Sequence, residues 1–325
     1  SLEIAWTYHS GDADTSNRTQ IQCNPLIIDG ILYGTSPTLK LFALDASNGQ
    51  EIWRFDPFAG NYDQFGMGVN RGLTIYRDGD TNTIFYTAGS HIYAVNAHNG
   101  VLVEEFGVGG KVDLHTGLGD AAADLYVGAN SPGVIFEDLL IIGTRVSEAM
   151  GAAPGYIRAF DVHSGILQWT FHTIPRPGEY GYETWPEGAW KNMGGANGWS
   201  GMSVDHDKGI VFVPTGSAAY DCYGGDRHGE NLFANCLLAL DAKTGERIWQ
   251  FQPVHHDRRE RELPAPPNLG TLEINAEQTA AVAQITKAGY VFLFDRESGE
   301  PIFPIEEVAV PGSGLRGESA WPTQP

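Results

Sequence analysis

The most informative stretch of the sequence is Ala239-Leu-Asp241-Ala-Lys-Thr-Gly245-Glu-Arg-Ile-Trp249. An apolar strand ends at Asp241, whose side chain can cap the turn that follows, and Gly245 can take the positive φ that such a turn needs. Alternation then resumes in a second strand that ends at Trp249. The pattern predicts a β-hairpin whose Trp lies on a face that must be covered, most simply by a neighbouring unit of the same kind.

The same frame recurs along the chain. Further copies are Phe42–Trp53, Ala159–Trp169, Leu293–Phe303 and Ala94–Gly100, the last of which is followed by Glu104 at the aromatic position. Residues 2–8, which include Trp6, resemble the tail of another copy, and in a closed propeller such a strand pairs with strands from the C-terminus. Copies of one strand-turn-strand frame, several tens of residues apart, are typical of the four-stranded blades of a β-propeller. The third and fourth units have room for long loops, where function usually lies.

Length and composition favour the same architecture. A chain of 325 residues is long for one compact domain, and 41 Gly with 18 Pro indicate many short strands joined by tight turns rather than disorder. We therefore predict an all-β fold, a single β-propeller domain over residues 1–325 with about five full blades. Residues 319–325 contain no strand that would close a ring, so we expect a partial propeller whose closing blades are missing. A closed five-bladed ring is the alternative.

The charge excludes one class of partner. A formal net charge of -20 would repel nucleic acid, and the sequence has no apolar run long enough to cross a bilayer and no signal peptide at its start. We expect a soluble, processed protein. The three cysteines, Cys23, Cys222 and Cys236, lack the spacing of zinc ligands. A Cys222–Cys236 disulfide and free thiols both remain open.

Short segments outside the repeat frame carry a resemblance to a known family. They are Val69–Gly72, Gly194–Trp199, Pro214–Ser217, Val254–Asp257, Leu263–Pro267 and Thr286–Gly289. In their order and spacing they resemble the pyrroloquinoline quinone (PQQ)-dependent dehydrogenases, eight-bladed quinoproteins, and most of all the branch of the membrane-bound glucose dehydrogenases. The resemblance covers almost the whole chain and implies that the C-terminal blades lie outside it.

The resemblance implies a set of cofactor-binding residues. A flat quinone would stack on Trp199, and the glycines Gly198 and Gly201 would let it approach. Arg71 would pair with a PQQ carboxylate, for which a planar guanidinium is suited. Lys287 would hydrogen-bond the quinone oxygens and stabilise the reduced form. The remaining cofactor contacts implied are Gln22, Arg145 and Asn197.

The residues alone leave simpler interpretations open. Trp199 would be another aromatic that docks one blade on the next, although it lies outside the Asp-to-Gly frame. Arg71 and Lys287, each next to an expected strand, would be exposed surface charges.

The resemblance also implies a calcium site and a general base. Glu148 aligns with the family carboxylate that binds Ca²⁺, a cation that prefers hard oxygen ligands. Ser217 stands where some relatives have an Asn ligand, which leaves the third protein ligand in doubt. Asp257 matches the Asp that takes the proton of the substrate hydroxyl and also touches the metal. By themselves, Glu148 would be a solvated loop residue and Asp257 would cap a turn.

Departures from the family pattern sharpen the expectation. Arg259 stands where lanthanide-using relatives have an extra Asp, so calcium is favoured over a lanthanide and magnesium stays open. Phe65–Gly66 replaces the vicinal cysteine pair of the alcohol-oxidising members. The charged run 258–262 replaces a more apolar segment beside the site, so substrate contacts there are expected to differ. No Cys-x-x-Cys-His occurs, and hence no c-type haem is expected in this chain.

Two functions follow from these patterns. The first is a periplasmic, PQQ- and Ca²⁺-dependent dehydrogenase that oxidises an alcohol group of a sugar or polyol and passes electrons to a quinone or cytochrome. The second is a non-catalytic propeller scaffold for protein assembly, which would keep the repeat frame and lose the central residues. The joint presence of Arg71, Glu148, Trp199, Asp257 and Lys287 favours the enzyme. The remaining C-terminal part of the same protein is a further expected partner.

Overall fold

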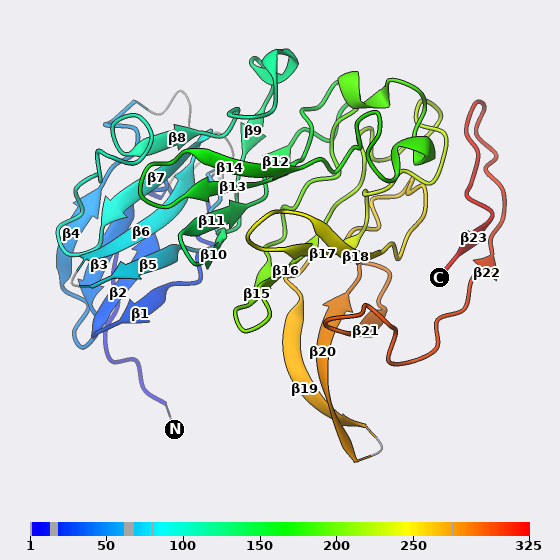
Figure 1. The fold of residues 1–325 in the computed structure, drawn as a ribbon. Helices are drawn as coiled ribbons and strands as arrows, with labels where there is room; N and C mark the ends of the chain where they lie inside the picture. Colours follow the sequence, from blue (N-terminus) through cyan, green and yellow to red (C-terminus); the bar gives the residue numbers. More distant parts are fainter. Residues whose placement is uncertain (1, 14–18, 62–67, 80, 275) are drawn as a thin grey trace.

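The computed structural model describes residues 2–13, 19–61, 68–79, 81–274 and 276–325. Phe65–Gly66, the expected substitute for a cysteine pair, lie outside these ranges. The fold is all-β, and its sheets follow one another in chain order (Figure 1). The predicted propeller architecture is confirmed, with each repeat forming one antiparallel sheet that we call a blade.

The blades have these strands. Blade 1 contains β1 (Leu26–Ile28), β2 (Ile31–Thr35), β3 (Leu41–Asp45) and β4 (Glu51–Phe55), and blade 2 contains β5 (Thr74–Asp78), β6 (Thr81–Ala88), β7 (His91–Asn96) and β8 (Lys111–Asp113). Blade 3 contains β10 (Val134–Phe136), β11 (Leu139–Ile142), β13 (Ile157–Asp161) and β14 (Leu167–Phe171). Blade 4 contains β15 (Ser203–Asp205), β16 (Ile210–Pro214), β17 (Leu237–Asp241) and β18 (Arg247–Phe251), and blade 5 contains β19 (Asn268–Ile274), β20 (Glu277–Ile285) and β21 (Val291–Asp295).

Two short strand pairs and three helical turns lie outside the blades. The strand pairs join β9 (Val127–Gly128) to β12 (Arg145–Val146) and β22 (Val308–Ala309) to β23 (Thr323–Gln324). The 3-10 turns are η1 (Asp120–Ala122), η2 (Tyr182–Thr184) and η3 (Ala189–Lys191). No helix among the described ranges is both long and apolar enough to span a bilayer.

The turn of the repeat has the predicted geometry. Asp241 Oδ1 accepts hydrogen bonds from the backbone N–H groups of Lys243 and Thr244 at 2.9 and 2.8 Å, and Gly245 has a φ of 75°. The four other copies have φ values of 70–75° at the corresponding glycine. The register of β17 and β18 shifts between Ala239 and Leu240, which is a β-bulge, and the same shift occurs in blades 1 and 3.

Trp53, Trp169 and Trp249 seal junctions between blades, and Trp6 covers the turn of blade 1 in the same way, so each Trp of the frame makes the same contact. It packs on the turn glycine that follows it and donates its indole N–H to a carbonyl beside that turn, over 3.0–3.3 Å. A Cβ on any of these glycines would come within 2.5–2.6 Å of the indole. The pairs are Trp6 with Gly49, Trp53 with Gly100, Trp169 with Gly245 and Trp249 with Gly299. The predicted covering of one repeat by the next is thereby confirmed.

The junction of blades 2 and 3 is built differently because Glu104 replaces the aromatic residue. The chain continues to Gly107, whose backbone N–H donates to Ser164 O at 2.9 Å. A Cβ on Gly165 would come within 2.6 Å of Val112 and 2.7 Å of Gly107 N. Backbone and a valine therefore occupy the place that an indole fills elsewhere.

Blade 5 differs from the prediction of about five full blades, since four are complete and this one has three strands among the described residues. Pro301 has no N–H to donate to a ladder, and only an isolated bridge joins it to Phe294. Phe303, the aromatic of this copy, is 61% exposed. In Figure 1 the first and fifth blades lie apart, so the described residues do not form the alternative closed five-bladed ring.

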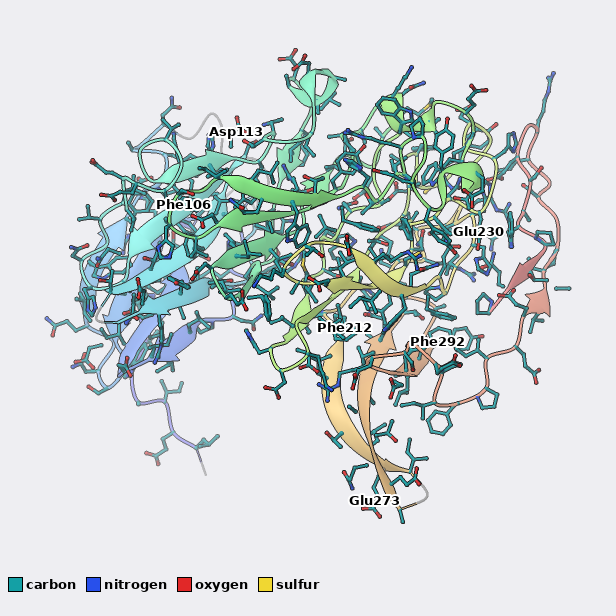
Figure 2. The ribbon with its side chains drawn as sticks, in the orientation of Figure 1. Phe106, Asp113, Phe212, Glu230, Glu273 and Phe292 are labelled. Carbon is teal, nitrogen blue, oxygen red and sulfur yellow. The ribbon has the colours of Figure 1, made fainter. Side chains whose placement is uncertain are left out.

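The core lies between neighbouring blades. One buried cluster joins Ile141 and Ile157 of blade 3 to Val211, Val213 and Leu238 of blade 4. Figure 2 shows Phe212 in the interior and Glu273 near the tip of the long hairpin of β19 and β20, which projects from the body. All three cysteines are free thiols, with Cys236 buried and Cys222 exposed, so the alternative of a Cys222–Cys236 disulfide is excluded.

Candidate active site

The topology brings one end of every blade to a common place. In an antiparallel blade the start of the first strand and the end of the second lie at the same edge. The first strands of successive blades contact one another, β5 with β10, β10 with β15 and β15 with β19. Residues just before a first strand, such as Arg71 and Trp199, therefore gather with residues just after a second strand, such as Arg145 and Lys287.

A cavity of about 220 Å³ lies at this end of the blades. Its lining includes Asn130, Asp221, Glu260 and Glu262, which the sequence did not single out. All predicted site residues except Ser217 and Asp257 also line it, namely Gln22, Arg71, Arg145, Glu148, Asn197, Trp199 and Lys287. The structure thus brings together side chains from all five blades. We call this space the central cavity.

Trp199 presents its ring to two cations. The Arg71 guanidinium lies 5.4 Å from the ring centroid and the Lys287 ammonium lies 5.7 Å from it. Ser131 Oγ donates to the Trp199 carbonyl at 2.7 Å, which ties this segment to the loop before blade 3. Trp199 does not pack on a turn glycine as the frame tryptophans do, so it is not a fifth docking aromatic.

The glycines beside Trp199 have another role than the expected one. A Cβ on Gly198 would come within 2.9 Å of Ile157, and one on Gly201 within 2.9 Å of Pro266. Both glycines therefore permit close packing within the protein, and their expected role in the approach of a cofactor stays a prediction. Gly216 is the glycine that makes room at the site, since a Cβ there would lie 3.0 Å from the Trp199 indole nitrogen and 2.4 Å from Glu262.

Arg71 is a half-buried cation without a carboxylate partner among the described residues. Its Nε donates to Gln22 Oε1 at 3.1 Å, while its Nη1 is buried and makes no hydrogen bond. Burial lowers the pKa of Arg71, and the positive charge of Arg145 lowers it further. Arg145 lies 3.9 Å from Glu148 and stacks over Tyr126. An anionic group between the two guanidinium groups would relieve their repulsion.

Lys287 is held by two carboxylates that the sequence analysis did not predict. Its Nζ lies 2.8 Å from Glu260 Oε1 and 2.9 Å from Glu262 Oε2. Burial alone would lower the pKa of Lys287, but these two hydrogen bonds raise it, so the ammonium stays protonated. Burial raises the pKa of Glu262, which also accepts a hydrogen bond from Ser217 N at 3.0 Å.

Ser217 and Asp257 do not line the central cavity. Ser217 Oγ donates to Asp257 Oδ2 at 2.6 Å, and Asn235 Nδ2 and Arg261 N donate to the same oxygen at 3.1 and 2.7 Å. Asp257 Oδ1 accepts one hydrogen bond, from Arg259 N at 3.0 Å. Asp257 therefore caps its own loop. It also lines a larger neighbouring cavity of about 840 Å³ between blade 5 and the C-terminal segment.

Asn197 and Asp221 complete the polar lining. Asn197 Nδ2 donates to Thr144 O at 2.8 Å, so its amide joins the loops of blades 3 and 4. Asp221 is 5% exposed, and no described residue forms a hydrogen bond or ion pair with its carboxylate. Burial raises the pKa of Asp221 to about 8, and the negative charges of Glu262, Glu148 and Glu260 add to the shift.

The donor set fits a flat polyanion better than a preformed metal cluster. The fit to a planar quinone with carboxylates rests on the unpartnered Arg71 Nη1 and on the Trp199 ring with a cation at two places over it. Among the described residues no three His, Cys, Asp or Glu side chains stand close enough to hold a metal ion by themselves. Glu148, Ser217 and Asp257 therefore stay predicted ligands, with the Glu148 side chain 64% exposed.

The residues that sequence reasoning missed share one property. Asp221, Glu260, Glu262 and Asn235 lie in loops outside the repeat frame, where no pattern separates a cavity carboxylate from a solvated one. Asp221 lies four residues after Ser217, and Glu260 and Glu262 belong to the run 258–262 that was expected to alter contacts beside the site. Their position near these segments was the only available signal.

Comparisons with known proteins show which family the chain resembles. The family described as PQQ: Glucose/ethanol/alcohol dehydrogenase, beta-propeller domain, matches residues 1–325. Quinoprotein glucose dehydrogenase A of Acinetobacter calcoaceticus is 32% identical over 100% of this chain and 44% of its own length. Quinate/shikimate dehydrogenase (quinone) of Acinetobacter baylyi is 29% identical over 100% of this chain and 43% of its own length.

Solved structures show the same fold. A quinohemoprotein alcohol dehydrogenase of Pseudomonas putida HK5 superposes with a TM-score of 0.78 at 23% identity, over 98% of this chain and 46% of the other. The chain thus spans less than half the length of these relatives.

Proposed function

We propose that this chain is the cofactor-binding part of a PQQ-dependent dehydrogenase. The premise is that the chain belongs to the PQQ family of glucose, ethanol and alcohol dehydrogenase propeller domains. The observation that carries the proposal is the Trp199 ring with Arg71 and Lys287 beside it in one cavity, where Arg71 Nη1 forms no hydrogen bond with a described residue. The substrate is an alcohol, as in relatives named for glucose, quinate and glycerol. We propose a sugar or polyol.

In this proposal the chain's residues divide the work of an alcohol oxidation. If bound here, PQQ would supply the hydride acceptor and Ca²⁺ would supply Lewis-acid polarisation. Trp199 supports the ring, Arg71 and Arg145 bind its carboxylates, and Lys287 donates hydrogen bonds to its oxygens. Gln22 and Asn197 add polar contacts. Glu262 fixes Lys287 in place by accepting a hydrogen bond at 2.9 Å.

Asp257 is our proposed general base for the proton of the substrate hydroxyl. Three donors occupy its Oδ2, but Oδ1 accepts a single hydrogen bond and retains capacity for another donor. The larger cavity that Asp257 lines offers an approach for a substrate. We also propose a periplasmic location and a quinone or cytochrome as the electron acceptor, both on the family resemblance.

A binding experiment tests the proposal. In the intact protein with Ca²⁺, PQQ is expected to quench tryptophan fluorescence, and Arg71→Met is expected to weaken PQQ binding by about 10- to 100-fold because it removes a charge-assisted hydrogen-bonding partner. The matched control is Arg77→Met. Arg77 is exposed, does not line the central cavity and forms only a long ion pair, at 3.8 Å, with Asp29. Trp199→Phe should reduce the quenching. If PQQ does not bind the wild-type protein, the scaffold function replaces this one.

A further inference from the structure

Asp221 is a buried carboxylate of the central cavity that forms no hydrogen bond or ion pair with any described residue. Its side chain lines the cavity, is 5% exposed and receives no hydrogen bond from a described residue. Arg227, the arginine of the same loop, donates instead to Asn231 Oδ1 at 2.8 Å and to the Asp257 carbonyl. Buried polar groups normally have a partner, so an unpartnered carboxylate facing a cavity indicates a ligand.

Most charged side chains around the cavity form ion pairs with one another, but one carboxylate and one guanidinium do not. Lys287 pairs with Glu260 and Glu262, and Arg145 lies 3.9 Å from Glu148. Among the described residues, Asp221 then remains as a carboxylate without an ion pair, although the charge of Arg227 acts on it, and Arg71 remains as a cation without one. A bound cation beside Asp221 and a bound polyanion beside Arg71 would satisfy both groups at once.

The predicted ligand on the same loop is already engaged. Ser217 Oγ donates to Asp257 and accepts from Asn235 Nδ2 at 3.2 Å, and Ser217 does not line the cavity. Asp221 follows it by four residues and does line the cavity. The Asp221 loop is also held in place, since Gly224 N donates to Glu318 Oε1 at 3.1 Å and Arg227 N donates to Gly224 O at 3.1 Å.

We propose that Asp221, rather than Ser217, supplies the carboxylate oxygen that completes the protein's share of a divalent cation site in the central cavity, together with Glu148. Ca²⁺ takes six to eight oxygen ligands at 2.3–2.6 Å, so cofactor oxygens and water fill the remaining positions. This inference rests on the proposed function for the identity of the cavity. Its experiment reads cation binding directly and therefore does not need turnover.

The test uses the intact protein after removal of metal with a chelator. Ca²⁺ affinity is measured by calorimetry and by Tb³⁺ emission sensitised by tryptophan. We expect Asp221→Asn to weaken Ca²⁺ binding by about 10- to 100-fold. Asp221→Glu, which keeps the carboxylate, should restore part of the loss. Asp226→Asn is the matched control, because Asp226 lies exposed on the same loop and should bind as the wild type does.

Two results would overturn the proposal. One is an Asp221→Asn variant whose Ca²⁺ affinity equals that of the wild type and of Asp226→Asn, and the other is a wild-type protein that binds no cation. If Asp221→Asn does not fold, a crystal of the wild-type protein soaked in Tb³⁺ settles the question, because the anomalous peak must lie within bonding distance of the Asp221 carboxylate. PQQ binding is followed separately, so a protein that binds Ca²⁺ through Asp221 but no PQQ refutes only the proposed function.

Discussion

The turn ends of the blades and the central cavity use the same repeats in opposite ways. At the turns, one contact is repeated four times, with an indole on a glycine and an N–H donated to a carbonyl. At the cavity, the blades contribute different residues, and no single contact is repeated from blade to blade. Repetition therefore stabilises the propeller, whereas departures from repetition make the site. Substitutions in the two regions should therefore separate activity from stability.

The largest expected effect is on turnover. Asp257→Asn keeps the shape of the side chain but removes the proton acceptor, so we expect kcat to fall by about 100- to 10,000-fold while PQQ stays bound. Dye-linked oxidation of glucose, quinate and simple alcohols measures turnover, and circular dichroism checks the fold.

The control for this experiment is a substitution of Glu262, a carboxylate that lines the central cavity. Glu262→Gln should weaken PQQ binding through Lys287 and lower kcat less than Asp257→Asn does. Should Glu262→Gln abolish turnover while Asp257→Asn leaves it within tenfold of the wild type, then Glu262, which lines the central cavity, is the base, and Asp257 only caps its loop.

The comparison also explains how far the sequence could be used. The Asp cap, the positive φ of the glycine and the docked Trp depend on neighbouring residues in the chain and on a repeated contact, so the frame around Gly245 was predictable. The three-stranded form of blade 5 was not predicted, although Pro301 in its fourth segment was a visible signal. The repeat frame predicts a fourth strand in this blade in spite of the proline.

The site was predictable only in part. The family motifs located Trp199, Arg71 and Lys287, and the structure brings them to one cavity. They did not show that Asp257 would accept hydrogen bonds from its own loop and from the loop between β16 and β17, or that Glu262 would hold Lys287. Such contacts join segments that are distant in the sequence, and no periodic sequence pattern predicts them.

The second effect in size concerns stability at the turns. Trp249→Ala removes an indole that is 7% exposed and leaves a cavity between blades 4 and 5, so we expect the free energy of unfolding to fall by about 3 to 5 kcal/mol. Glu104→Ala, at the corresponding position of blade 2, is exposed and should change it by less than about 0.5 kcal/mol. Urea unfolding followed by fluorescence and circular dichroism measures both. Equal losses in the two variants would contradict the role of the indole.

The smallest effect tests the one junction without an indole. Gly107 and Gly109 both have a φ of 61°, so replacing either by Ala adds the same backbone strain. A Cβ on Gly107 would lie 2.2 Å from Lys111 O and 2.7 Å from Val112, whereas nothing lies within 4 Å of one on Gly109. Gly107→Ala should therefore lower the free energy of unfolding by about 1 to 3 kcal/mol more than Gly109→Ala. The difference isolates the close backbone packing that replaces the Trp between blades 2 and 3. An equal loss in both variants would mean that other contacts hold this junction and that blades 2 and 3 pack less tightly where Glu104 replaces the aromatic residue.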